Sequence, residues 1–396
     1  MLAGTGQTFA TQSEPPGRTA QIAVPTNDPY MALFAVALTA IKHGDYATAI
    51  SMLKGLYRDR PTPRIRLELA RAYYLDRQYA LAREQFEKVL DQPELPWGVR
   101  QNVDRYLERI EDSLGKVSLS FSLISDSNPL NLTDHRQINI FGTTQTLTPP
   151  SNSGEIWGMQ IQVNATRAFT DDATLVSFTN IAFKNFEGSA LDRWTINSGV
   201  AWAPRATPKW RGKLGLEYVF LDGHTHYRLP YISATYFPDP IYEFKLSGEF
   251  RLSYLDVPRY DYLDAHIQTL DLKALYTFSD GSQMLGRTYL EHTLTEDAAY
   301  ENWGTGFSLD YTMPVYGSWK LTTAGSLGFR TYQDTDPLFL ERREDLTKKA
   351  RFTLSNKNWK IFGTTPEFGV AYERTDSSID YYSYDKISLI LSTKGS

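Results

Sequence analysis

The stretch 115–124 reads GKVSLSFSLI, and its apolar residues occupy every second position. The apolar members are Val117, Leu119, Phe121 and Leu123, and Ser118, Ser120 and Ser122 lie between them. A period of two is typical of a β-strand with one apolar and one polar face. Because the same period continues almost to the C-terminus, we expect most of the chain to form an antiparallel sheet.

The alternating region divides into 14 predicted strands. An even strand number is typical of closed bacterial barrels, and so is the alternation of short turns with longer loops. The longest predicted loops lie near 125–155 and 333–344. The predicted strands are 117–124, 156–168, 173–186, 193–203, 210–221, 228–237, 241–255, 264–278, 283–294, 302–313, 318–332, 345–354, 359–373 and 381–393.

Strand length and residue placement favour a membrane barrel over a soluble sandwich. Most predicted strands reach 10 or more residues, and such strands can cross the hydrocarbon at a tilt of about 45°. Sandwich strands are commonly about 5–6 residues long. Aromatic residues lie mostly near the strand ends of the apolar face, as in the girdles of outer-membrane barrels. In lipid, only closure of the sheet pairs every backbone group.

A different period marks residues 28–114, where apolar residues follow helical spacing. The pattern repeats after 33 residues, so that Tyr46 matches Tyr79 and Ala49 matches Ala82. Period and residue types resemble the tetratricopeptide repeat, with two repeats and a final helix near 97–114. The predicted fold is therefore α+β and multidomain, a short tetratricopeptide-like solenoid followed by a 14-stranded antiparallel transmembrane β-barrel.

Three segments make up the predicted organisation. Residues 1–27 are rich in Thr, Gln, Pro and Ala and are expected to be a disordered leader. Residues 28–114 are the predicted periplasmic helical domain, and residues 115–396 are the predicted barrel. The leader lacks a signal-peptide pattern, so we expect Met1 to follow a removed signal and the final Gly395-Ser396 to be a cloning remnant.

Composition argues against several classes of site. The absence of cysteine excludes disulfides, Cys-ligated zinc and thiol nucleophiles, and a net charge of -5 gives no support to nucleic-acid binding. No G-x-S-x-G, H-E-x-x-H or P-loop pattern is present. We expect no enzyme activity, no cofactor and no metal. His224 and His226 are placed in a loop, and His266 and His292 are expected to line the lumen.

Helical repeats ahead of a 14-stranded barrel resemble the Slam family, the surface lipoprotein assembly modulators. Two short elements add to the resemblance, Ser125-Asp126-Ser127-Asn128-Pro129 and the segment Thr365-Pro366-Glu367-Phe368 that leads to Tyr372-Glu373-Arg374. The resemblance implies a bacterial outer-membrane translocator that moves a surface lipoprotein, or a secreted haem-binding protein, from periplasm to cell surface. The repeats would receive the client and the barrel would be its conduit. Outer-membrane lipid, lipopolysaccharide and a periplasmic chaperone are further expected partners of a monomeric barrel.

A lipidated client requires a lateral opening, because each acyl CH₂ prefers the bilayer to an aqueous lumen by about 0.8 kcal/mol. The expected opening is the closure seam between the first and last strands. Its candidate residues are Val117, Leu119, Phe121, Leu123, Ile387, Leu389 and Leu391.

Further candidates for client contact lie on the repeats and in the loops. Arg71, Tyr74 and Arg77 are candidates on the concave face of the repeats, whereas Tyr73 is expected to pack between helices. Asp126, Ser127 and Asn128 either face the client or form an Asx-type turn. Phe339 and Leu340 are either exposed contacts or part of loop packing.

Two competing functions remain open at the level of sequence, a polysaccharide exporter and a general porin. Rows of acidic and aromatic residues facing one lumen would favour a sugar, and a porin would not need the helical domain. No nucleotide-binding pattern is visible, so transport is expected to be passive.

Overall fold

The computed structural model describes residues 28–92, 95–148, 155–187, 191–204, 206–356, 358–360 and 365–394. The predicted leader and the Gly395-Ser396 tail lie outside these residues. The chain forms two compact units, the first ending at Tyr106 and the second beginning at Leu107. The predicted domain boundary at residue 115 stays a prediction.

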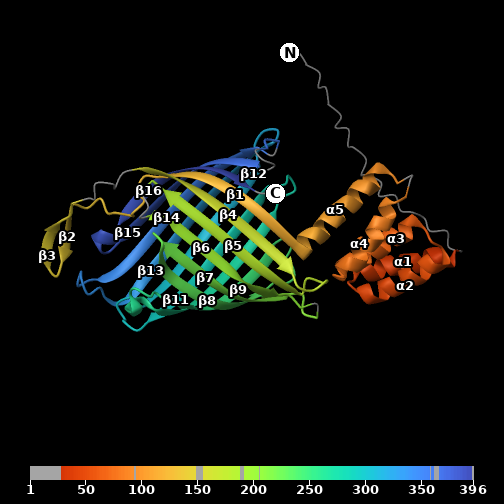
Figure 1. The fold of residues 1–396 in the computed structure, drawn as a ribbon, viewed down its shortest axis with the longest axis horizontal. Helices are drawn as coiled ribbons and strands as arrows, with labels where there is room; N and C mark the ends of the chain where they lie inside the picture. Colours follow the sequence, from red (N-terminus) through yellow and green to blue (C-terminus); the bar gives the residue numbers. More distant parts are fainter. Residues whose placement is uncertain are drawn as a thin grey trace, which may run out of the picture. The chain divides into compact units, whose positions relative to one another are not determined.

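The helical unit begins with two helix pairs and continues into a longer helix (Figure 1). The helices are α1 (Pro29–Lys42), α2 (Tyr46–Asp59), α3 (Pro63–Leu75), α4 (Tyr79–Leu90) and α5 (Trp97–Leu114). Helices α2 and α4 begin at the predicted repeat partners Tyr46 and Tyr79, and Ala49 and Ala82 are fully buried. Small residues there allow close helix approach. Among the described helices, none is long and apolar enough to cross a membrane.

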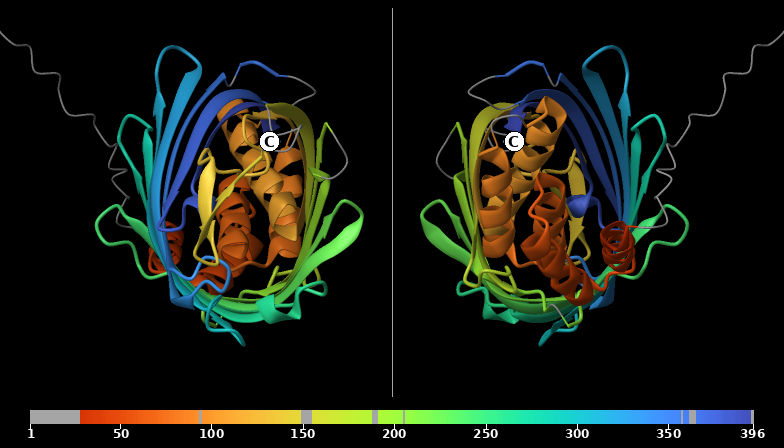
Figure 2. Two further views of the ribbon diagram at one scale, coloured as in Figure 1. Left: turned by 90° about the vertical axis from the view of Figure 1, so that its left-hand side faces the viewer. Right: turned by 90° about the vertical axis from the view of Figure 1, so that its right-hand side faces the viewer.

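Fourteen antiparallel strands close into a ring in which β1 pairs with β16 (Figures 1 and 2). The strands are β1 (Gly115–Asp126), β4 (Ile156–Ala168), β5 (Leu175–Phe186), β6 (Arg193–Trp202), β7 (Trp210–Leu221), β8 (His224–Tyr236), β9 (Lys245–Leu255), β10 (Ala265–Thr277), β11 (Gln283–Thr295), β12 (Asn302–Pro314), β13 (Trp319–Thr335), β14 (Arg342–Asn356), β15 (Thr365–Ser377) and β16 (Tyr384–Lys394). The predicted closed barrel is confirmed.

Several boundaries differ from the sequence prediction. The first long loop contains a hairpin, β2 (Gln137–Ile140) and β3 (Thr143–Thr146), whose turn residues Phe141 and Gly142 both have positive φ, as a tight hairpin turn requires. Strand β8 begins at His224, so placing His224 and His226 in a loop was wrong. Strands β9 and β15 begin later than predicted, at Lys245 and Thr365.

Strand register separates a polar inner face from an apolar outer face. Directly paired residues share a face, so the row Ser118, Asn164, Asn180, Asn197 and Glu217 crosses five neighbouring strands on the inside. The outer face exposes Val117, Leu214, Phe307 and Phe352, each by about half or more. An antiparallel ring with a wet interior and an apolar exterior is the architecture of an outer-membrane barrel, and the chain accordingly resides in the bacterial outer membrane.

Glycines on the inner face make room for aromatic rings on the next strand. A Cβ built on Gly215 would lie 2.6 Å from the Tyr231 ring, and one on Gly306 would lie 2.6 Å from the Tyr289 ring. The rings can therefore lie flat against the wall instead of projecting across the lumen. This pairing keeps the interior open and fixes the local register.

We expect Gly306→Val to destabilise the barrel by about 1–3 kcal/mol, because the new side chain must displace Tyr289 and the Leu327 carbonyl. Urea unfolding in lipid vesicles, followed by tryptophan fluorescence, measures the change. Gly325→Val is the matched control, since nothing lies within 4 Å of a Cβ at Gly325. Equal stability of the two variants would contradict the aromatic–glycine contact.

Candidate functional site: the closure seam, the inner wall and the loop cap

The ring is closed by its shortest ladder. Strand β1 pairs with β4 along its whole length, from Gly115↔Arg167 to Asp126↔Ile156. With β16 it shares only the pairs from Phe121↔Thr393 to Ile124↔Ile390. Main-chain pairing therefore contributes less at the β1–β16 seam than on the other side of β1.

Side-chain hydroxyls extend this ladder. The Ile387 N–H donates to Ser127 Oγ at 2.8 Å and the Leu389 N–H donates to Ser125 Oγ at 3.2 Å. At the other end, the Phe121 N–H donates to Thr393 Oγ1 at 3.2 Å. One further backbone bond crosses the seam, from the Ser127 N–H to the Ile387 carbonyl at 3.0 Å. The hydroxyl acceptors can rotate away without displacing the backbone, so strand separation here breaks fewer backbone–backbone bonds than at the longer ladders.

The Asp126-Ser127-Asn128 element ties the first strand to the last. Asp126 Oδ1 accepts from the Asn128 N–H at 3.0 Å, which is the Asx turn considered from the sequence. Asn128 Nδ2 donates to the carbonyls of Leu132 at 2.8 Å and Asp385 at 3.1 Å. The element is therefore a turn that also clamps the start of β16, a role that sequence reasoning missed.

The predicted seam residues all lie on the outer face, but they are not all partners. Leu123 and Leu391 are directly opposite each other. Among the described strands, Val117 and Leu119 are paired only with β4, opposite Ala165 and Val163. Phe121 is directly opposite Thr393. The backbone N–H groups of Ile387 and Leu389 donate to the hydroxyls of Ser127 and Ser125.

A cap forms from the β2–β3 hairpin and two other loops. Ile138, Phe339 and Ile379 make a buried apolar cluster, and the Phe141 N–H donates to the Leu338 carbonyl at 2.8 Å. Phe339 is only 9% exposed, so its expected role as an exposed contact is wrong and the loop-packing alternative holds. Leu340 is 58% exposed and remains a candidate for client contact.

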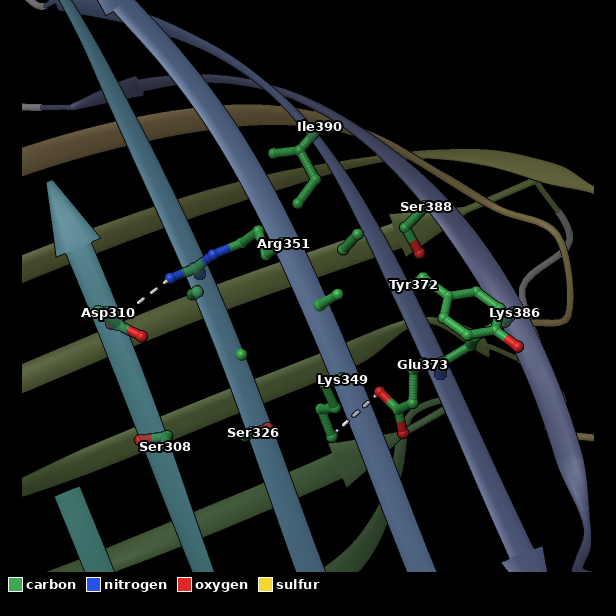
Figure 3. Close-up of a pocket in the computed structure, with 14 residues that line it drawn as sticks. Ser308, Asp310, Ser326, Lys349, Arg351, Tyr372, Glu373, Lys386, Ser388 and Ile390 are labelled. Carbon is green, nitrogen blue, oxygen red and sulfur yellow. Dashed lines mark ion pairs between the residues drawn. The ribbon is translucent and has the colours of Figure 1, made fainter. Parts of the chain in front are cut away.

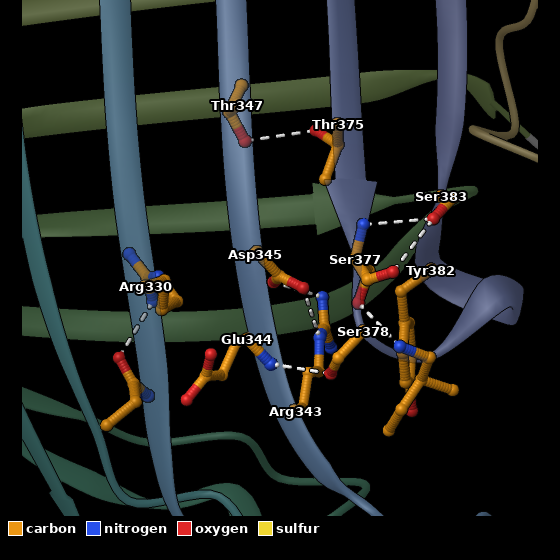
Figure 4. Close-up of polar contacts among 12 residues, drawn as sticks. Arg330, Arg343, Glu344, Asp345, Thr347, Thr375, Ser377, Ser378, Tyr382 and Ser383 are labelled. Atoms are coloured by element: carbon orange, nitrogen blue, oxygen red, sulfur yellow. Dashed lines mark hydrogen bonds and ion pairs between the residues drawn. The ribbon is translucent and has the colours of Figure 1, made fainter.

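The cap is fastened to the barrel by Arg343 and Tyr382. The guanidinium lies 3.6 Å from the Tyr382 ring centroid and 2.8 Å from Asp345 (Figure 4). The Tyr382 hydroxyl donates to Asp336 Oδ2 at 3.0 Å. Burial, and next the Asp336 carboxylate, raise the pKa of Tyr382, so the phenol stays a hydrogen-bond donor at neutral pH.

Charged residues of β12 to β16 line a cavity of about 350 Å³ on the inner wall (Figure 3). Lys349 pairs with Glu373 at 3.0 Å, and Arg351 lies 3.9 Å from Asp310. The partners of Lys349 and Arg351 lie on other strands, so local alternation in the sequence could not identify them. This wall can bind charged or strongly hydrated groups.

The histidines of β10 and β11 do not face the lumen. His266 and His292 share the outer face with Leu270 and Leu290, since the register places them in the same alternating row. His292 stacks on Trp303 with centroids 4.0 Å apart. The expectation of lumen-lining histidines was wrong. In the described part of the chain no cluster of three His, Asp or Glu side chains could hold a metal ion.

Candidates on the helical unit divide between packing and exposure. Tyr74 packs against Tyr79 and Tyr106, with centroids 5.9 and 5.1 Å apart, and Tyr73 is buried as expected. Arg71 is exposed beside Glu68 at 3.5 Å. Arg77 adopts φ 61° just after α3. Arg71 is therefore better presented to a client than Tyr74.

We expect Asn128→Ala to loosen the top of the seam, because it removes the side-chain bonds to Leu132 and Asp385 at a cost of about 1–3 kcal/mol. Amide hydrogen exchange at the start of β16 should become faster. Asn139→Ala is the control, since the Asn139 side chain makes one long bond, to Thr144 at 3.4 Å. Unchanged exchange at β16 in Asn128→Ala would show that the clamp is not a constraint.

Phe339→Ala should open the loop cap, because it empties the centre of the apolar cluster at a cost on the order of 3 kcal/mol. Limited proteolysis of the hairpin on the purified barrel measures the opening. Leu340→Ala changes the exposed neighbour and should leave the cleavage rate as it is. If the hairpin is cleaved at the same rate in both variants, Phe339 does not stabilise the cap.

Comparison with known proteins gives one family match. Residues 259–395, which contain β10 to β16, match the family model described as surface lipoprotein assembly modifier. Helices followed by a closed 14-stranded barrel fit that family, and the resemblance inferred from the sequence is confirmed. A comparison with curated proteins gives no match.

Similar solved structures are outer-membrane proteins of low sequence identity. OprB of Pseudomonas putida is 9% identical, with 73% of this chain and 96% of that chain covered and a TM-score of 0.42. A loop-deletion mutant of OmpT from Vibrio cholerae is 9% identical, with 71% and 99% covered and a TM-score of 0.38. A bacterial polysaccharide outer membrane secretin is 7% identical, with 70% and 98% covered and a TM-score of 0.34.

Proposed function

Because residues 259–395 carry the signature of the surface lipoprotein assembly modifiers, we propose that this outer-membrane transporter moves a client protein from periplasm to cell surface. The client is a surface lipoprotein or a secreted haem-binding protein. Its polypeptide passes along the polar inner wall, and any acyl chains leave sideways through the β1–β16 seam.

The short ladder at the seam is the observation that carries this proposal. In the described strands the ladder has four residue pairs, with serines on its inner face and aliphatic side chains on its outer face. Separation of β1 from β16 would connect the lumen with the bilayer. A lipidated client needs this geometry, because its acyl chains stay in hydrocarbon while its polypeptide stays hydrated.

The outer surface beside the seam gives further support. On β12 the outward row runs from Met313 to Trp303 without a charge, whereas on β14 the row that starts at Leu354 is interrupted by Lys348. Lys348 and Arg374 both pair with Asp376, at 2.9 and 2.7 Å. Charged residues are unfavourable against acyl chains, so the bilayer should be thinner here. A thin bilayer lowers the barrier to lateral exit.

The helical unit supplies a surface for a client. Leu33, Val36 and Leu81 are exposed apolar residues of α1 and α4, and Arg71 is exposed on α3. Exposed apolar positions interspersed with cations suit reversible binding of an incompletely folded chain. The receptor role of the repeats therefore belongs to the same proposal.

A polysaccharide exporter is the second candidate, and one group on the inner wall favours it. The Tyr227 hydroxyl donates to Glu217 at 2.7 Å, and the Tyr231 hydroxyl donates to Asn197 at 3.0 Å. Tyrosine beside acid and amide groups suits sugar hydroxyls. A neutral sugar has no charged group to pair with the cationic residues of β13 to β16. The loop cap, in turn, does not suit a general porin.

Surface protease digestion of intact cells tests the main proposal. A lipoprotein encoded in the neighbouring reading frame should become protease-accessible when this chain is co-expressed, and should stay protected without it. Liposome swelling with small sugars is the parallel measurement for a porin. Equal accessibility with and without the chain, in cells where both proteins are made, would contradict protein export.

A disulfide across the seam should block display of a lipidated client. Ser122 and Ser392 are direct partners on the inner face, so Ser122→Cys with Ser392→Cys changes little in volume, and the chain has no other cysteine. We expect display to be lost on oxidation and restored by reductant.

The matched control is Ser308→Cys with Ser326→Cys, which joins β12 to β13 at another direct inner-face serine pair. Oxidation there should leave display unchanged. Normal display through an oxidised β1–β16 seam would rule out the lateral route, and export through the lumen alone would then be required.

A further inference from the structure

Two cations face each other on the inner wall, and neither forms an ion pair within the described residues. Lys184 of β5 is directly opposite Arg193 of β6, in the same inward row as Gln160 and Ser122. Like charges directly opposite each other are destabilising in a sheet. Such a pair is therefore unfavourable for the empty barrel.

The contacts of this pair are with neutral groups. Lys184 Nζ lies 4.4 Å from the Phe186 ring centroid, and Arg193 donates to the Tyr227 hydroxyl at 3.5 Å. Within the described residues neither side chain makes an ion pair with a carboxylate. Both charges are held in place and remain available to an incoming anion.

The inner-wall carboxylates near this pair already have other partners. Asp126 accepts from the Asn128 N–H and lies 3.8 Å from Lys386, and Glu217 accepts from the Tyr227 hydroxyl. Further along the wall, two carboxylates are each shared by two cations. Asp271 is shared by Lys273 and Arg287. Glu249 is likewise shared by Lys213 and Arg251. The interior thus carries surplus positive charge although the whole chain has a net charge of -5. Walls of one sign focus the field and concentrate ligands of the opposite sign.

We propose that Lys184 and Arg193 form a binding site for an extended acidic polypeptide segment, rich in Asp or Glu, as it passes along the lumen. The choice of a polypeptide rests on the proposed export function. A passing carboxylate would bridge the two cations and relieve their repulsion. The site would hold acidic segments reversibly and disfavour basic ones, so it would contribute to client selection.

Peptide binding to the purified full chain in detergent tests this site. The probes are fluorescent ten-residue peptides of alternating Gly-Glu, Gly-Lys or Gly-Gln, measured by anisotropy at low and high salt. We expect the Gly-Glu peptide to bind at least about tenfold more tightly than the others, and salt to weaken its binding.

Lys184→Gln with Arg193→Gln should abolish the preference for the acidic peptide. The matched control is Lys348→Gln with Arg374→Gln, which removes a directly paired lysine and arginine from the outer face and should keep the preference. Heat-modifiable electrophoretic mobility verifies that both variants are folded. Equal loss in both variants would show a general charge effect and overturn the site.

Three other outcomes would overturn the proposal. The first is no preference for the acidic peptide in either the natural chain or the cap-opening variant Phe339→Ala. The second is tight binding of an acidic oligosaccharide without binding of the acidic peptide, which would favour the polysaccharide candidate. The third is equal competition by inorganic phosphate, which would show a small-anion site. None depends on client display, so failure of export and failure of this site are distinguishable.

Discussion

Backbone hydrogen bonding in hydrocarbon is the constraint on which the whole barrel depends. Each strand N–H and C=O that faces acyl chains without a partner is strongly unfavourable, so the sheet must close. Closure places β1 beside β16 although they lie at opposite ends of the alternating region. It also gives the ring a single junction between strands distant in the chain, and this is where the ladder is shortest.

The seam replaces part of its backbone pairing with side-chain bonds. Ser125, Ser127 and Thr393 provide hydroxyl acceptors, and Asn128 clamps the start of β16. Hydroxyl and amide side chains can exchange protein partners for water more readily than a fixed ladder can. The seam therefore has hydrogen-bond partners when it is closed, and separating its two strands costs comparatively little free energy. A lateral exit requires this property.

The inner wall and the loop cap serve a different requirement. The cluster of Ile138, Phe339 and Ile379 packs three separate loops together. Arg343 and Tyr382 connect that cluster to the barrel. On the inner wall, inward-facing cations share a smaller number of carboxylates. The lumen is therefore lined by hydrated polar groups and has a positive electrostatic potential.

The sequence by itself determined the two periods, the strand number and the repeat partners Tyr46 and Tyr79, because these depend on local alternation and spacing. It also determined which residues of a strand share a face, as for Val117, Leu119, Phe121 and Leu123. Only the tertiary structure decided that Asn128 bonds to Asp385, that Phe339 is buried under a hairpin, and that Lys184 lies opposite Arg193. Each of these depends on strand register or loop contact between residues far apart in the chain, and a one-residue shift in register would turn a strand's side chains to the other face without changing the local pattern.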